Sequence, residues 1–177
     1  MEPTAGNDRI SRTWNPAEHG ENTSPAPNCN SGTPRGDKGL RIVVADDHDA
    51  LRKHVCRLLT EAPDLEIVGQ AANGQKAIAL ARELMPDVVL MDVNMPHVDG
   101  IEATRQIVRD HPAVRVVAMS ADWNKRTVTG MLDAGASGWV SKTGVFDTLV
   151  EAIRTVTAGK HHICPEVLSV LENQGSP

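Results

Sequence analysis

The sequence predicts a doubly wound α/β domain, in which helices cover both faces of a parallel sheet. From Leu40 onward, short apolar runs alternate five times with segments whose apolar residues recur three and four positions apart. This alternation is typical of βα units. The runs hold few polar residues, as expected of strands that are buried on both faces.

Each predicted strand is one of these apolar runs, and each predicted helix is marked by apolar residues at helical spacing. In chain order the strands are Arg41–Ala45, Glu66–Gly69, Val88–Met91, Val114–Met119 and Gly138–Ser141. The helices carry Leu51, Val55, Leu58 and Leu59; Ala77, Leu80, Ala81 and Leu84; Ile101, Thr104, Ile107 and Val108; Val128, Met131 and Leu132; and Phe146, Leu149, Val150 and Ile153, the last ending before Gly159. With right-handed crossovers, they form a flavodoxin-like five-stranded sheet of order 2-1-3-4-5, flanked by five helices.

The flanking residues are predicted to be tails. Residues 1–38 are rich in Pro, Gly, Asn, Ser and Thr, so we expect a disordered N-terminal tail. Residues 39–160 form the predicted domain. Residues 161–177 are too few for another domain and are expected to be a short tail or a truncated linker, with room for a short helix starting at Pro165.

Composition excludes several classes of function. The net charge is -5 and lysines and arginines do not cluster, so we expect no direct binding of nucleic acid. The three cysteines are scattered and odd in number, which favours a reducing compartment, the cytoplasm. No apolar run has the length of a signal peptide or a membrane span. We therefore expect no association with membranes.

Polar residues close the predicted strands at one edge of the sheet. Asp46 and Asp47 follow the first strand, Asp92 the third, Ser120 closes the fourth, and Lys142 follows the fifth. In open α/β sheets, ligands bind at the carboxyl ends of the strands where the strand order reverses. Three carboxylates about 5 Å apart would repel by roughly 3 kcal/mol per pair at an effective dielectric near 20. Mg²⁺, held directly by Asp47 and Asp92, would remove this conflict.

The same residue types suit phosphoryl transfer. Asp92 can act as the nucleophile, Lys142 can pair with the charge of a phosphoryl group, and the Ser120 hydroxyl can donate to one of its oxygens. Because all three close neighbouring strands, the sequence predicts that they act at one site.

The stretches VVADDH, VVLMDVNMPHVDGIEA, VVAMSA and GASGWVSK occur in this order. Together they resemble the CheY-like receiver domains of response regulators in two-component systems, over about residues 41–159. The DDH opening, a lysine not followed by proline, and the ending LVEAIRTVTAGK are most similar to receivers of the NarL/LuxR class.

The resemblance implies a role for each site residue. A histidine kinase would phosphorylate Asp92, while Asp46, Asp47, Asp92 and the backbone carbonyl of Asn94 hold Mg²⁺. Ser120 and Lys142 would coordinate the phosphoryl group, and Ser120 and Trp139 would form the switch, with the indole moving from solvent toward the core. Asn94 and Asp122 would let water reach the acyl-phosphate and limit its lifetime to minutes.

Several outputs remain open at this stage. The domain could signal to a protein partner or form a homodimer through its fourth and fifth helices. It could instead be the receiver of a truncated LuxR-type DNA-binding regulator, because no helix-turn-helix domain follows residue 160. A haloacid dehalogenase-type phosphatase is disfavoured, since Asn94 replaces the acidic residue expected there and the acidic pair precedes the nucleophile. We expect no enzymatic activity beyond Mg²⁺-dependent self-phosphorylation and slow autodephosphorylation.

Overall fold

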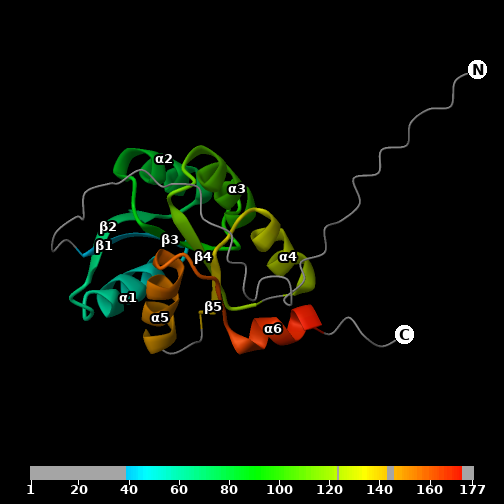
Figure 1. Cartoon of the computed structure of the whole chain (residues 1–177). Helices are drawn as coiled ribbons and strands as arrows, with labels where there is room; N and C mark the ends of the chain where they lie inside the picture. The colour runs from blue at the N-terminus through cyan, green and yellow to red at the C-terminus, as the bar shows by residue number, and fades with distance from the viewer. Residues whose placement is uncertain (1–38, 123, 143–145, 173–177) are drawn as a thin grey trace, which may run out of the picture. The chain divides into compact units, whose positions relative to one another are not determined.

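The computed structural model describes residues 39–122, 124–142 and 146–172; the predicted N-terminal tail lies outside them. It contains one parallel six-stranded sheet of order β2-β1-β3-β4-β5-β6 (Figure 1). The strands are β1 Leu40–Ala45, β2 Leu65–Ala71, β3 Val88–Asp92, β4 Arg115–Ser120, β5 Gly138–Ser141 and β6 His162–Ile163. The predicted order 2-1-3-4-5 is thereby confirmed.

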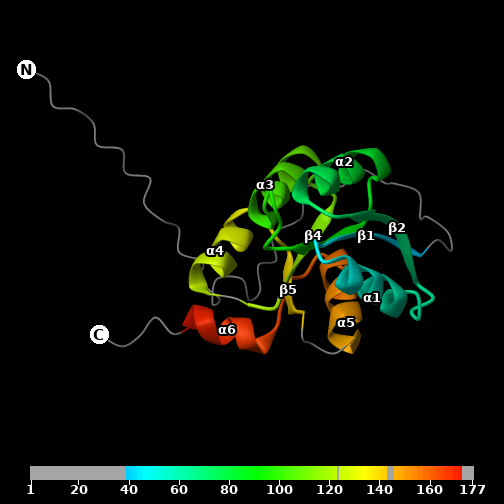
Figure 2. The ribbon, with the colours of Figure 1, turned by 180° about the vertical axis from the view of Figure 1, so that it is seen from behind.

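Helices cover both faces of the sheet, as the two opposite views show (Figures 1 and 2). The helices are α1 Asp49–Leu59, α2 Gly74–Leu84, α3 Gly100–Asp110, α4 Lys125–Asp133, α5 Phe146–Thr157 and α6 Pro165–Glu172. α1 and α5 share one core with the sheet, and α2, α3, α4 and α6 share the other. The structure therefore has the three layers of the predicted doubly wound fold.

Side-chain caps explain where three of these helices begin. Asn73 accepts a hydrogen bond from the backbone N–H of Lys76, and Asp99 accepts one from Glu102. The side chains of Asn124 and Thr127 each accept a hydrogen bond from the backbone N–H of the other residue, which forms a capping box at the start of α4. These bonds satisfy N–H groups that a helix cannot satisfy internally.

Alternation along the buried strands divides the core into two parts. Val43 and Met91 point toward α2 and α3, whereas Val44 and Leu90 point toward α1 and α5. Both sets are fully buried, because successive strand residues face opposite sides of a covered sheet. The central strands are thus fixed from both faces, and their carboxyl ends hold a defined position.

A sixth strand and a sixth helix extend the predicted fold. The sequence predicts five of each in the domain, followed by a short tail with room for a helix from Pro165, and in the structure β6 pairs with β5 and α6 packs beside α4. Cys164 and Val167 are buried in the core. The helix expected from Pro165 is confirmed. A strand of two residues is too short to give a periodic signal, so the sequence does not predict it.

Within the described residues, no helix combines the length and the apolar character that crossing a membrane requires.

If the segment after residue 160 belongs to the core, Val167→Ala should destabilise the domain. The substitution removes two buried methyl groups and leaves a cavity, which costs about 2 kcal/mol of unfolding free energy. Ser169→Ala changes an exposed side chain of the same helix and should alter that free energy by less than about 0.5 kcal/mol. Chemical denaturation of both variants measures the difference, and equal stabilities would show that α6 is not anchored.

Candidate functional site

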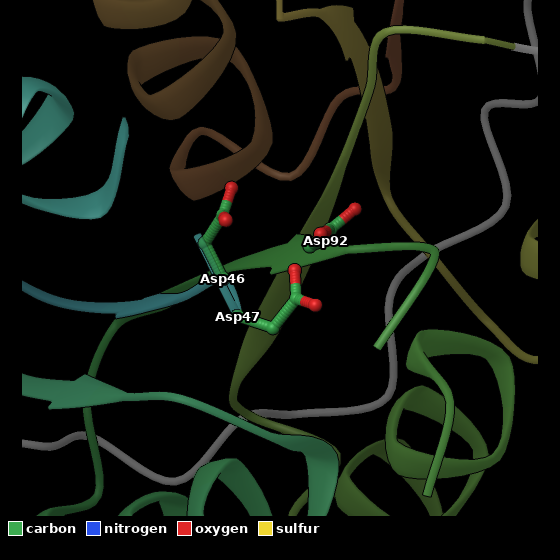
Figure 3. A group of neighbouring side chains, drawn as sticks. All are labelled: Asp46, Asp47 and Asp92. Carbon is green, nitrogen blue, oxygen red and sulfur yellow. The ribbon is translucent and has the colours of Figure 1, made fainter. Parts of the chain in front are cut away.

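The predicted site residues meet at the carboxyl edge of the sheet. Asp46 directly follows β1, Asp92 is the last residue of β3, and Ser120 is the last residue of β4. Lys142 directly follows β5. Figure 3 shows Asp46, Asp47 and Asp92 at the neighbouring ends of β1 and β3. Because the strands are parallel, residues that are far apart in the chain reach one edge.

Lys142 joins two of the carboxylates. Its ammonium nitrogen lies 2.8 Å from Oδ2 of Asp46 and 2.8 Å from Oδ2 of Asp92. Its side chain is only 12% exposed, and both aspartates are buried. Asp47 is exposed at the mouth of the site. The lysine therefore ties the ends of β1, β3 and β5 together by charge.

Each buried carboxylate is also held by its own loop. Oδ1 of Asp46 accepts a hydrogen bond of 2.8 Å from the N–H of His48, and Oδ1 of Asp92 accepts one of 3.1 Å from the N–H of Asn94. This is the local pattern in which an aspartate bonds the backbone two residues later. In both aspartates, one oxygen thus orients the side chain and the other faces Lys142.

Burial and pairing shift the pKa values of the site in opposite senses. Desolvation is the main cause that raises the pKa of Asp92 above its usual value, and the charge of Asp46 adds to it, although the hydrogen bond and charge of Lys142 act to lower it. Desolvation also acts to lower the pKa of Lys142, but the bonds to Asp46 and Asp92 outweigh it, and the net shift is upward. The ammonium is therefore charged at neutral pH, while burial disfavours the charged form of the Asp92 carboxylate.

The carboxylates fit a divalent cation. Oxygen atoms of Asp46, Asp47 and Asp92 lie within 4.8 Å of one another. Three negative charges and the one positive charge of Lys142 leave a formal charge of -2, which one divalent cation neutralises. Oδ2 of Asp46 has the close ion pair with Lys142 but no hydrogen bond of suitable geometry. A small hard cation with oxygen ligands, such as Mg²⁺, suits this donor set.

Gly100 allows the loop after Asp92 to close tightly. A Cβ atom at this position would lie 2.1 Å from the carbonyl oxygen of Asp92 and 2.9 Å from Cα of Val93. Both are backbone atoms, so they cannot move aside. The N–H of Gly100 also donates to the carbonyl of Val93. The start of α3 therefore rests directly on the backbone of the predicted phosphoacceptor.

The remaining predicted residues surround this centre. The hydroxyl of Ser120, which is buried, donates to the backbone carbonyl of Asp122. The side chains of Asn94 and Asp122 are exposed, and their effect on the lifetime of an acyl-phosphate stays a prediction.

Trp139 requires a correction. The expected switch places its indole in solvent before activation, but in the structure the side chain is 0% exposed and packs in the core that α6 also joins. Its Nε1 atom is buried without a hydrogen-bond partner. The expectation is wrong about the starting position because the sequence does not reveal that residues after 160 cover this part of the sheet.

Arg52 contributes to the site without a signal in the sequence. Its guanidinium donates a hydrogen bond of 2.6 Å to the carbonyl of Asp46, and its side chain is 12% exposed. It also pairs with Asp49. An arginine on a polar helix face normally indicates a solvated position, so only the structure reveals that it supports the loop after β1.

The site geometry agrees with the comparisons. A protein-family model described as the response regulator receiver domain matches residues 42–154. The chain belongs to this family. The receiver is 43% identical over 132 residues to the response regulator GacA of Pseudomonas viridiflava, covering 75% of this chain and 62% of that protein.

Solved structures of response regulators are also similar to this chain. A two-component response regulator of the LuxR family from Aurantimonas sp. SI85-9A1 matches with a TM-score of 0.72 and 34% identity, over 76% of this chain and 96% of that one. The signal receiver domain of NarL from Mycobacterium tuberculosis matches with a TM-score of 0.66 and 32% identity, over 70% and 99%. The chain spans about three fifths of the GacA protein.

Gly100→Ala should distort the site. The new methyl group would force the backbone of Asp92 and Val93 apart, and we expect a loss of about 1 to 3 kcal/mol in unfolding free energy together with weaker Mg²⁺ binding. Gly130→Ala is the matched control, because its Cβ would meet only the flexible end of Ile101 and the change favours a helix. Denaturation and calorimetric Mg²⁺ titration test both. Unaltered Mg²⁺ affinity in Gly100→Ala would contradict the close approach.

Proposed function

We propose that this receiver accepts a phosphoryl group on Asp92 from the phosphohistidine of a sensor kinase. The observation that carries the proposal is the buried Asp92 carboxylate, which Lys142 bridges to Asp46 at the switch point of the sheet. A lysine placed there can pair with the phosphoryl charge as it develops. Membership of the receiver family supports the same role.

In this reaction, a carboxylate oxygen of Asp92 attacks the phosphorus, the phosphorus–nitrogen bond breaks, and the imidazole leaves with the bonding electrons and takes up a proton. Oδ1 of Asp92 is held by the N–H of Asn94, so the side chain is oriented before the donor arrives. Lys142 shifts from the carboxylates toward the new phosphoryl oxygens. Ser120 donates its hydroxyl to one of them after leaving the carbonyl of Asp122.

We assign Mg²⁺ to Asp47 and Asp92, with Asp46 beside them and the carbonyl of Asn94 as the further ligand that the resemblance implies. When bound, Mg²⁺ supplies charge neutralisation at the phosphoryl oxygens. The net charge of the described cluster and the short distances between the carboxylate oxygens of Asp46, Asp47 and Asp92 support this assignment. Lys142 alone leaves part of the negative charge uncompensated.

For output, we propose a protein partner or a second copy that binds through α4 and α5, with the protein acting in the cytoplasm. The two cysteines within the described residues are free, which suits a reducing compartment. We expect the receiver to turn over no separate substrate beyond its own phosphorylation and slow autodephosphorylation. The longer length of GacA favours, as a second candidate, the receiver part of a LuxR-type transcriptional regulator.

Asp92→Asn should abolish phosphorylation, because an amide cannot form the acyl-phosphate. Lys142 keeps its ion pair with Asp46, so the variant should still fold. Asp99→Asn is the control: this exposed aspartate caps α3 through Oδ1, and asparagine can do the same. Intact-mass spectrometry after incubation with acetyl phosphate and Mg²⁺ checks both. A full phosphoryl increment on Asp92→Asn would refute the assignment.

Asp47→Asn should weaken Mg²⁺ binding at least tenfold, equal to about 1.4 kcal/mol, because it removes an exposed ligand without burying an unpaired charge. Asp110→Asn is the matched control, since Asp110 is an exposed carboxylate that pairs with Arg109 in the last turn of α3. Titration calorimetry measures the affinities. Replacing both Asp46 and Asp47 by alanine should also remove phosphorylation, and undiminished phosphorylation in excess chelator would exclude the metal.

A further inference from the structure

The last described part of the chain, β6 and α6, lies against the end of the sheet. β6 extends the sheet beyond β5, and α6 contacts α4, as both views show (Figures 1 and 2). We call residues 162–172 the strap. Among the strap side chains whose burial is described, Cys164 and Val167 are buried and share a cluster with Val128 and Met131 of α4.

The strap pairs with the sheet over a short length. β6 has only two residues, and its flanking hydrogen bonds run from the N–H of His162 to Ser137 and from the N–H of Cys164 to Trp139, at 3.2 and 3.1 Å. The connection from α5, residues 158–161, is exposed throughout. Gly159 has a φ of 80° there, a conformation natural to glycine. A segment joined in this way can detach while the remaining sheet stays intact.

Trp139 anchors the strap. Its backbone carbonyl accepts the hydrogen bond from Cys164, and it pairs in register with Ile163 of β6. Its indole lies in the same cluster as Cys164 and Val167, and its Nε1 is buried without a partner. A buried donor without an acceptor costs free energy, so a state in which this N–H reaches a partner is favoured by that amount.

The same short strand reaches the site. Lys142 follows β5 three positions after Trp139, and its N–H donates to the carbonyl of Ser120. A phosphoryl group on Asp92 would draw the ammonium and the Ser120 hydroxyl away from their present partners. Any resulting shift of β5 acts directly on the strand pairing and on the packing of Trp139.

We propose that the strap is a detachable intramolecular cover, which Trp139 holds on β5 and α4 and which phosphorylation of Asp92 releases. This inference rests on the proposed function. Release uncovers the β5 edge and the apolar surface of α4 around Val128 and Met131. The chain itself is therefore the resting occupant of a surface that its activation makes available.

The thiol of Cys164 reports the strap position. It is 3% exposed, and burial raises its pKa, so alkylation of the resting protein should be slow. The test uses the full chain with Cys29→Ser and Cys56→Ser, which leaves Cys164 as its single cysteine. Iodoacetamide labelling is followed by intact mass with and without acetyl phosphate and Mg²⁺. We expect phosphorylation to accelerate labelling at least tenfold.

Two further variants act as controls. A chain that retains only Cys56, which is buried between α1 and the sheet, should label at the same rate in both states. Val167→Asp in the Cys164-only chain places a charge under α6 and should give rapid labelling without phosphorylation.

The intact mass separates the two levels of the proposal. A phosphorylated protein whose Cys164 labels no faster would overturn the strap and leave the proposed function standing. Absence of a phosphoryl increment would overturn the proposed function and this inference with it. Equal acceleration at Cys56 would indicate general loosening and would also overturn the strap.

Discussion

The structure of the site depends on one half-buried cation between two buried anions. Lys142 contacts Asp46 and Asp92 at the same distance, and both aspartates are buried. Buried charges are stable only when they are paired and hydrogen-bonded. The lysine therefore helps to fix the relative positions of three strand ends. Any ligand that competes for its charge weakens its ion pairs and so affects the ends of β1, β3 and β5 together.

Much of this arrangement could be predicted from sequence because strong signals coincide. Strands β3 and β5 are short apolar runs, and β5 has the predicted bounds Gly138–Ser141. The carboxyl ends of parallel strands lie at one edge of the sheet regardless of loop conformation. The proximity of Asp46, Asp92 and Lys142 therefore follows from topology. The cluster of carboxylates within 4.8 Å agrees with this expectation.

The features that sequence does not reveal depend on contacts between distant backbones. β6 is held by backbone hydrogen bonds, which leave no residue pattern. The burial of Trp139 depends on that strand and on α6, so missing these elements also leads to a wrong prediction of the environment of Trp139. The bond from Arg52 to the carbonyl of Asp46 likewise depends on where a loop lies and not on a motif.

The composition of the core has a consequence for how it can rearrange. Among the described residues, Trp139 is the largest fully buried side chain, and its cluster contains alanines, valines and the thioethers of Met91 and Met131. An indole that leaves such a cluster vacates more volume than any aliphatic neighbour, and β-branched side chains have little rotamer freedom to fill it. Unbranched methionines can fill irregular space by rotating about three bonds. The methionine side chains of this cluster are thus well suited to preserve packing density if Trp139 changes position.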